Sequence, residues 1–215
     1  MSKAYSEIDF STQVTQDRTW RLKEISDLKG AVEKADQSLQ KVLLRALVTI
    51  CYAHWEGYVR FAARRYLEHI SLRRLQFSEL DIQFRINHFL PRLAALATAK
   101  TSIQERANLV SAILDSKTQR FSRANDELVD TKSNLNAKIL SEICLVCSLP
   151  EEPFTEKSTF INVVLLKRRN SIAHGEETFI EIGDLEELTA GTIELMRMFG
   201  DALENRVVLR GYRAA

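Results

Sequence analysis

Apolar positions recur at helical spacing along most of the chain. The clearest run covers residues 39–70, and its first half is apolar nearly all round, which predicts a central helix packed on several sides. Stripes at the same spacing predict further helices over residues 14–35, 103–114, 135–147, 155–169 and 184–208. Seven Gly, three Pro and a lack of regular apolar–polar alternation argue against a sheet. The pattern therefore predicts an all-α bundle.

The breaks between these stripes lie within one domain. No linker, repeat or low-complexity segment is evident in residues 1–215, so we expect a single helical domain that opens with an N-terminal helix in residues 1–36. Residues 115–134 are polar and predict a mobile insertion. Residues 178–182 predict a short extended segment.

Two of the expected helices begin with residues suited to capping. Ser102 is followed three residues later by Glu105, which is the pattern of a capping box. Asp184 and Glu187 have the same spacing before the last helix. We therefore expect Ser102 and Asp184 to cap their helices.

The bulk composition permits a sizeable core. The chain has 215 residues, of which 45% are hydrophobic and 27% are charged. Its net charge of +1 argues neither for nor against nucleic acid. No apolar run reaches membrane length, and residues 1–7 lead into no signal-peptide core. We therefore expect a cytoplasmic protein with no membrane partner.

The three cysteines fit that compartment. Cys144 and Cys147 form a Cys-x-x-Cys, but their neighbours are Leu, Val and Ile, which favours a buried helix face. A zinc site needs two more ligands at suitable spacing, and a redox pair needs a strand that leads into a helix N-terminus. We therefore expect no metal site and no cofactor.

An Arg-x4-His sequence stands where an apolar helical pattern gives way to glycine. Arg169, Asn170 and His174 are followed by Gly175, which is a natural helix stop. Arginine keeps its charge, whereas histidine gains or loses a proton near neutral pH. Together they supply what RNA cleavage needs without a metal ion, because the cation stabilises the phosphorane and the imidazole moves protons. Arg168 is a candidate for a further phosphate contact.

The same spacing occurs a second time, in Arg64 and His69. These two residues lie inside the long central helix, where positions five apart point about 140° away from each other. Only a pair beside a helix break can turn both groups toward one target. The comparison favours Arg169 and His174 as the functional pair.

The stretch from Arg168 to Gly175 resembles the signature of HEPN domains (higher eukaryotes and prokaryotes nucleotide-binding). Active members of this all-helical superfamily carry Arg, a polar residue, about three others and then His. A second stretch, from Ala53 to Arg60 and followed by Tyr66, is similar to the early helix of the prokaryotic branches called RiboL-PSP-HEPN and MAE-type. The resemblance implies a HEPN-like bundle with additional helices.

The resemblance also implies a function. HEPN proteins of this kind are expected to be metal-independent ribonucleases, to form homodimers with facing motifs, and to act in toxin–antitoxin or antiviral systems with an antitoxin or defence partner. Arg169 and His174 match the functional pair, and Asn170 matches the polar position. Some HEPN toxins carry a tyrosine two residues after the histidine for AMP transfer by a partner. Glu176 stands there in this chain, so that mode of control is not supported.

Polar residues of the central helix are further candidates. Glu56 and Arg60 are four apart in the order that favours an ion pair, although Glu56 or His54 could instead reach the catalytic cleft. Seven arginines between Arg60 and Arg92 are interleaved with aromatic residues. This stretch predicts either a surface that follows a phosphate backbone and stacks unpaired bases or a solvated face balanced by acids elsewhere. Glu56, Arg60 and Arg64 are therefore candidate substrate-binding residues.

These observations together predict an RNA endonuclease, in which attack by the 2′-hydroxyl leaves a 2′,3′-cyclic phosphate and a 5′-hydroxyl. Two alternatives remain open. One is a non-catalytic HEPN-like binding module, in which Arg169 and His174 close the dimer interface. The other is a structural subunit of a toxin–antitoxin or defence complex whose chemistry lies in another chain.

Overall fold

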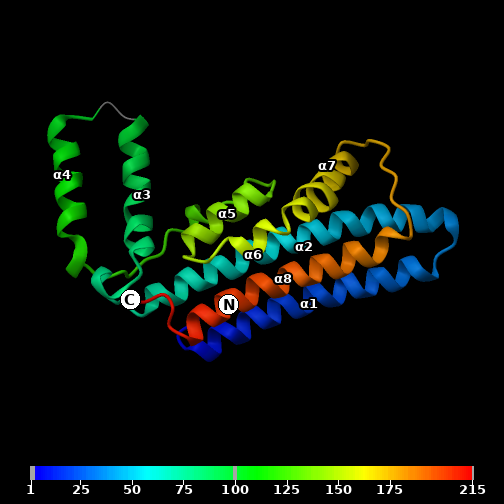
Figure 1. The fold of residues 1–215 in the computed structure, drawn as a ribbon, viewed down its shortest axis with the longest axis horizontal. Coiled ribbons are helices and arrows are strands. Elements are labelled where there is room, and N and C mark those ends of the chain that lie inside the picture. Colours follow the sequence, from blue (N-terminus) through cyan, green and yellow to red (C-terminus); the bar gives the residue numbers. More distant parts are fainter. Residues whose placement is uncertain (1–2, 99–100, 215) are drawn as a thin grey trace.

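The computed structural model describes residues 3–98 and 101–214, and these ranges contain helices and no β-strand. Three long helices run side by side in Figure 1, namely α1 (Glu7–Lys34), α2 (Gln37–Leu72) and α8 (Asp184–Val208). The shorter ones are α3 (Ile82–Thr98), α4 (Ile103–Leu114), α5 (Ala137–Val146), α6 (Glu152–Thr155) and α7 (Arg168–Ala173). Three of these, α5 to α7, lie along one face of the long helices. The all-α prediction is confirmed.

Helix α2 is the centre of the core, as its apolar surface predicts. It packs against α1, α8 and α7, and many of its side chains are buried. The fully buried large ones are Leu44, Leu47, Tyr52, Trp55, Tyr58, Tyr66 and Ile70. A Cβ on Gly200 of α8 would lie 2.1 Å from the Tyr58 hydroxyl, so glycine lets α8 approach α2 closely.

The two capping predictions have different outcomes. Ser102 and Glu105 form the predicted capping box at the start of α4. The expected cap at Asp184 is wrong, because Asp184 is already the first residue of α8 and the N-cap is Gly183. The Asp184 carboxylate instead lies 3.2 Å from the Arg168 guanidinium and accepts a hydrogen bond from the backbone N–H of Glu181.

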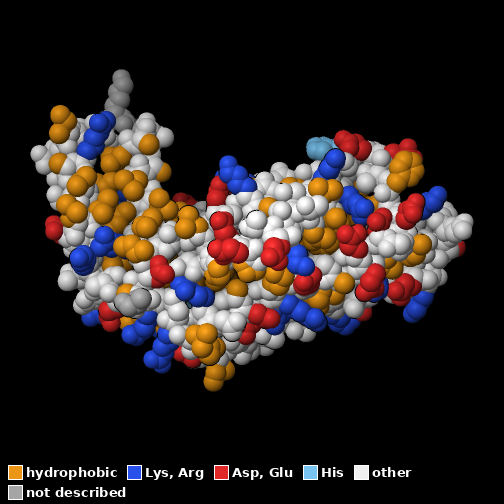
Figure 2. All heavy atoms as spheres, viewed as in Figure 1, with side chains coloured by type: hydrophobic (Ala, Val, Ile, Leu, Met, Phe, Trp, Pro, Cys, Tyr) orange, Lys and Arg blue, Asp and Glu red, His pale blue; other side chains and the backbone are white. Residues whose placement is uncertain are grey.

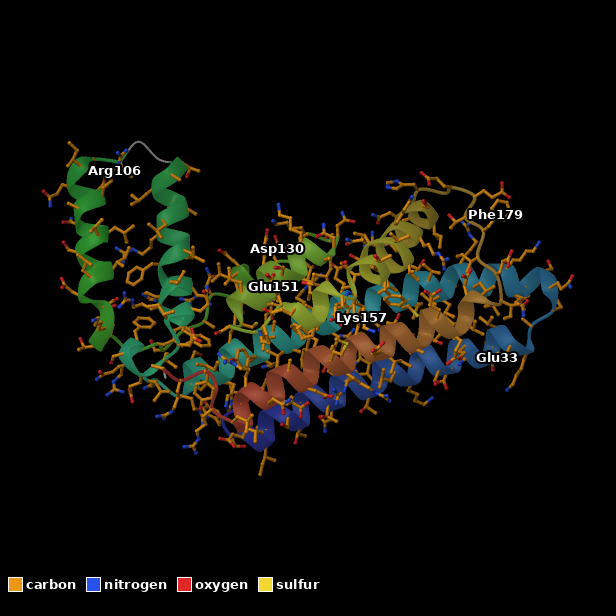
Figure 3. All side chains as sticks on the ribbon, viewed as in Figure 1. Glu33, Arg106, Asp130, Glu151, Lys157 and Phe179 are labelled. Carbon is orange, nitrogen blue, oxygen red and sulfur yellow. The ribbon has the colours of Figure 1, made fainter. Side chains whose placement is uncertain are left out.

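Helices α3 and α4 form an arm that projects from one end of the bundle (Figure 1). Hydrophobic side chains gather over this arm in Figure 2, and Arg106 lies near its free end in Figure 3. The exposed apolar side chains of the arm are Ile82, Ile86, Leu93, Ile103, Val110 and Leu114. The sequence pattern did not predict α3, which contains Pro91.

The segment from 115 to 134 is mostly irregular, with short 3₁₀ turns at Asp115–Thr118 and Asp126–Leu128. Phe121 and Val129 within it are nevertheless buried. The mobility expected for this segment stays a prediction, as does the single-domain organisation. Residues 176–181 are irregular and take part in no strand.

Candidate functional site

The Arg-x4-His motif lies at the end of a helix with an unusual interior. Residues Phe160–Lys167 form a π-helix, and α7 continues it with normal α-helical geometry. Ile161 and Leu165 are buried, and Arg169 follows four residues later with its side chain directed at α2. π-helical turns are rare and occur often at functional sites. The π-helical segment therefore belongs to the framework that positions Arg169.

Gly175 ends this helix as predicted. Its φ of +77° lies in the left-handed region that glycine tolerates. The Gly175 N–H donates to the Ile172 carbonyl at 3.1 Å, and the Glu176 N–H donates to the Ser171 carbonyl at 2.9 Å, which is the Schellman arrangement. The Arg45 guanidinium of α2 donates to the Glu176 carbonyl at 3.2 Å. The turn after the motif is therefore held on both sides.

Arg169 is enclosed by four groups and keeps 22% of its side chain exposed. Its guanidinium carbon lies 4.2 Å from the centroid of the Tyr52 ring. It donates to the Asn170 side-chain oxygen at 2.8 Å and to the Ser133 carbonyl at 3.0 Å. A Glu56 carboxylate oxygen lies 3.7 Å away. A cation–π contact with these hydrogen bonds fixes the plane of the guanidinium.

Asn170 orients the arginine beside it. Its side-chain oxygen accepts from Arg169, while its side-chain N–H donates to the Asn134 side-chain oxygen at 3.2 Å. Tyr52 holds the same loop from the other side, because its hydroxyl accepts the Leu135 N–H at 2.6 Å. Burial, with the nearby Glu56 carboxylate, raises the pKa of Tyr52 above its ordinary value.

Sequence reasoning missed these loop partners. Ser133 and Asn134 belong to the segment 115–134 that predicts an insertion, and Tyr52 lies in the nearly all-apolar first half of the central helix. One signal was present for Tyr52, since it stands four residues before Glu56 and so shares its helix face. No local signal marked Ser133, because it contributes its backbone carbonyl.

Glu56 contacts both Arg60 and Arg169, and its role in a catalytic cleft stays a prediction. It forms the expected ion pair with Arg60, at 3.0 Å, and it also approaches Arg169. Thr131 donates to the same carboxylate oxygen at 2.5 Å and accepts from Arg60 at 2.7 Å. Since Glu56 is 7% exposed, this carboxylate is a buried link between Arg60 and Arg169.

His174 lies at the C-cap of α7 and is exposed. Among the described residues its imidazole has no hydrogen-bond or ion-pair partner, and no contact joins it to Arg169 within the chain. The imidazole is therefore free to meet a ligand or a second protein surface.

The side chains of Arg64 and His69, the second Arg-x4-His copy, point in different directions, as helix geometry predicts. His69 is fully buried, stacks near Phe10, and its Nδ1 lies 2.9 Å from the Ala4 carbonyl. Arg64 is exposed and reaches only the Val129 carbonyl, at 3.4 Å.

Two other candidate residues face away from the motif. His54 lies edge-on to Trp20 of α1, and its Nε2 is 2.8 Å from a Glu24 carboxylate oxygen, so it does not reach the Arg169 cluster. Burial lowers the pKa of His54 despite that carboxylate. Arg168 pairs with Asp184, and a phosphate contact at Arg168 would compete with this ion pair.

The base-stacking interpretation of the Arg60–Arg92 stretch is wrong for the four aromatic residues on which it was based. Four of its five aromatic residues belong to the core or are buried beside it and expose at most 3% of their surface: Tyr66, Phe77, Phe84 and Phe89. The fifth, Phe61, is half-buried. A ring must expose a face to stack on a base, so the four buried rings stabilise the fold. The apolar contacts of α3 explain why arginines and aromatic residues alternate there.

The cysteines are buried, as the apolar pattern around them predicts. Cys51, Cys144 and Cys147 are free thiols, and burial raises the pKa of both Cys51 and Cys144 to about 12. Across residues 3–98 and 101–214, no group of three or more His, Cys, Asp or Glu side chains is placed to hold a metal ion. None of the helices described has the length and apolar character that a membrane span requires.

A helical bundle that presents an Arg-x4-His motif at a helix end defines a HEPN-type protein. The RiboL-PSP-HEPN family model matches residues 16–205, and the chain belongs to this family. No curated protein and no solved structure matches the chain. Membership in this family supports a ribonuclease-type role.

Proposed function

We propose that the chain is an RNA endonuclease that uses Arg169 and His174 without a metal ion and acts as a toxin or antiviral-defence effector. The single observation that carries the proposal is the contrast between these residues. Arg169 is rigidly held by Tyr52, Asn170 and Ser133, whereas the His174 imidazole, one turn later, is exposed and unengaged in the described chain. A fixed cation beside a free proton carrier suits phosphodiester cleavage.

The chemistry needs no cofactor. A neutral His174 imidazole accepts the proton of a ribose 2′-hydroxyl, and the 2′ oxygen attacks the adjacent phosphorus. The bond from phosphorus to the 5′ oxygen breaks, and that oxygen takes a proton from the His174 imidazolium that the first step formed. Arg169 stabilises the negative charge that builds on the phosphoryl oxygens, and Asn170 keeps the guanidinium in place. The products are a 2′,3′-cyclic phosphate and a 5′-hydroxyl.

The proposal includes a homodimer in which two motifs form one cleft. Within one chain Arg169 faces α2, whereas His174 has no partner among the described residues. Phe179, on the loop just after the motif (Figure 3), is 83% exposed, and Ile182 is 48% exposed. Apolar side chains beside the motif favour a covered surface, and two-fold symmetry would bring a second Arg169 to each His174.

The test is cleavage of total tRNA and messenger RNA by the purified protein, with and without EDTA, followed by analysis of the ends. We expect cyclic phosphate ends, equal activity in EDTA, and loss of at least about a hundredfold with His174→Ala. His88→Ala is the matched control, because His88 is an exposed histidine on α3, away from the motif. Activity that requires magnesium or manganese would contradict the mechanism.

A second candidate function rests on one observation. Arg169 already has four partners, as an arginine with a structural role would. In that case the chain is a HEPN-like binding or structural subunit of a toxin–antitoxin or defence complex. The same assay separates the two, since this alternative expects no cleavage by wild-type protein at any concentration tested.

A further inference from the structure

A groove of about 620 Å³ runs along α2 from Gly57 to Leu72. One wall is a single face of α2, and the opposite wall is the irregular segment at residues 122–126. This volume lies within the range of roughly 300–1,000 Å³ that is usual for small-molecule sites. Its lining includes Gly57, Arg60, Phe61, Arg64, Arg65, Glu68, Arg123, Asp126 and Lys3.

The charge of the groove is positive. Five cations line it against the two acids Glu68 and Asp126, and Glu68 is already paired with Arg65 at 2.6 Å. The side chains of Lys3 and Arg123 have no hydrogen-bond or ion-pair partner in the described ranges. Unpaired cations in a concave surface concentrate anionic ligands.

The groove reaches the motif through one residue. Arg60 lines the groove, and its guanidinium also contacts Glu56 and Thr131. The other oxygen of Glu56 lies 3.7 Å from Arg169. The groove is therefore linked to the candidate catalytic arginine through the buried Glu56 carboxylate.

An aromatic surface is present in the groove as well. Phe61 is half-buried in the wall, and the Arg65 guanidinium lies 5.5 Å from the centroid of its ring. Planar groups of this kind stack on unpaired bases, whereas bases inside a duplex are not accessible to them.

We propose that this groove binds single-stranded RNA on one side of the scissile phosphate, with Arg64 and Arg123 on successive phosphates and a base against Phe61. The inference rests on the proposed function for the identity of the ligand. It adds Arg123, Lys3, Arg65 and Phe61 to the substrate-binding residues that the sequence predicted.

The test measures binding, so it does not depend on cleavage. A labelled single-stranded RNA of about ten nucleotides is titrated by fluorescence anisotropy into the His174→Ala protein, at several salt concentrations. Arg64→Glu with Arg123→Glu is expected to weaken binding at least about tenfold and to reduce the salt slope. Phe61→Ala should weaken binding without changing that slope.

Arg197→Glu is the matched control. Arg197 is an exposed arginine on α8 outside the groove, so its reversal changes the net charge as Arg64→Glu or Arg123→Glu alone does. We expect the affinity of this variant for the RNA to stay within about twofold of the affinity of the parent protein. Equal losses in control and groove variants, no loss in the groove variants, or equal affinity for a blunt duplex would overturn the proposal.

The two proposals fail separately. If wild-type protein cleaves no RNA and the groove variants still lose binding, the groove stands as an RNA site and the endonuclease proposal falls. If wild-type protein cleaves RNA and binding is insensitive to Arg64 and Arg123, the endonuclease stands and the groove proposal falls.

Discussion

The guanidinium carbon of Arg169 lies 4.2 Å from the centroid of the Tyr52 ring, although 116 residues separate the two along the chain. The same tyrosine accepts the Leu135 N–H through its hydroxyl. Tyr52 therefore contacts the candidate catalytic arginine through the face of its ring, and it contacts the loop before α5 through its hydroxyl. The two contacts can be separated by substitution.

Tyr52→Phe is expected to lower the free energy of unfolding by about 1–3 kcal/mol. The phenyl ring still supports Arg169, but the buried Leu135 N–H loses its acceptor. Urea unfolding measures the change. Tyr58→Phe is the control, because the buried Tyr58 hydroxyl has no hydrogen-bond partner in the described chain, and its removal should change stability by less than about 0.5 kcal/mol.

Glu56→Gln should destabilise the protein by about 2 kcal/mol. A neutral amide removes the buried charge that Arg60, Thr131 and Arg169 surround, and leaves their donors poorly paired. Glu68→Gln breaks one half-buried pair with Arg65, and we expect it to cost less than about 1 kcal/mol. Thermal and urea unfolding measure the stability of the two variants. Equal losses of stability would contradict the interpretation of Glu56 as a buried link.

Gly175→Ala should cost about 1–2 kcal/mol and lower cleavage, because alanine is strained at a φ of +77°. Nothing lies within 4 Å of the position of an added Cβ, so the effect is one of backbone strain alone. Gly183→Ala has the same open surroundings at a φ of −62°, and it should be nearly neutral. A similar loss in both variants would show that the Schellman turn does not require glycine.

Stability should fall in mildly acidic solution. Burial lowers the pKa of both His54 and His69 below the ordinary value of 6.5, so the unfolded state binds protons at a higher pH than the folded state does. Their contribution is therefore complete above about pH 6.5 and is lost as the pH falls below that value. Melting temperatures at pH 7.5, 6.5 and 5.5 measure the loss, and a flat profile would contradict it.

Mixing two inactive variants tests the shared cleft. In an Arg169→Ala and His174→Ala heterodimer, a cleft that takes Arg169 from one subunit and His174 from the other keeps one intact pair. About a quarter of the wild-type cleavage should return after subunit exchange. If each protomer has a self-contained site, no activity returns, and a monomer by light scattering would remove the basis of the prediction.

The periodic pattern predicted the long helices because α2 and α8 bury wide apolar surfaces, and such surfaces are visible in local sequence. It missed α3, where arginines alternate with aromatic residues and Pro91 interrupts the pattern. It placed the cap of α8 one residue late, an error of the size that helix boundaries usually carry.

The motif was predicted, but its surroundings were not. Arg169, His174 and Gly175 are close in sequence, and their spacing can be read directly. The contacts of Arg169 with Tyr52 and Ser133 join segments that are distant in sequence. The contact with Ser133 uses its backbone carbonyl, which every residue type has, so the sequence gives no sign of it. The π-helical turns depend on hydrogen-bond register, which side-chain pattern does not specify.

The order of the helices also has a consequence in time during synthesis. The apolar surface of α2 is covered by α8, and α8 is the last of the described helices to be synthesised. At roughly 5–20 residues per second, the stretch from Leu72 to Val208 takes on the order of ten seconds to make. During that interval α2 lacks its cover from α8, and the contact between Tyr52 and Arg169 cannot form until α7 has been made. The cluster around Arg169 therefore forms only late in synthesis.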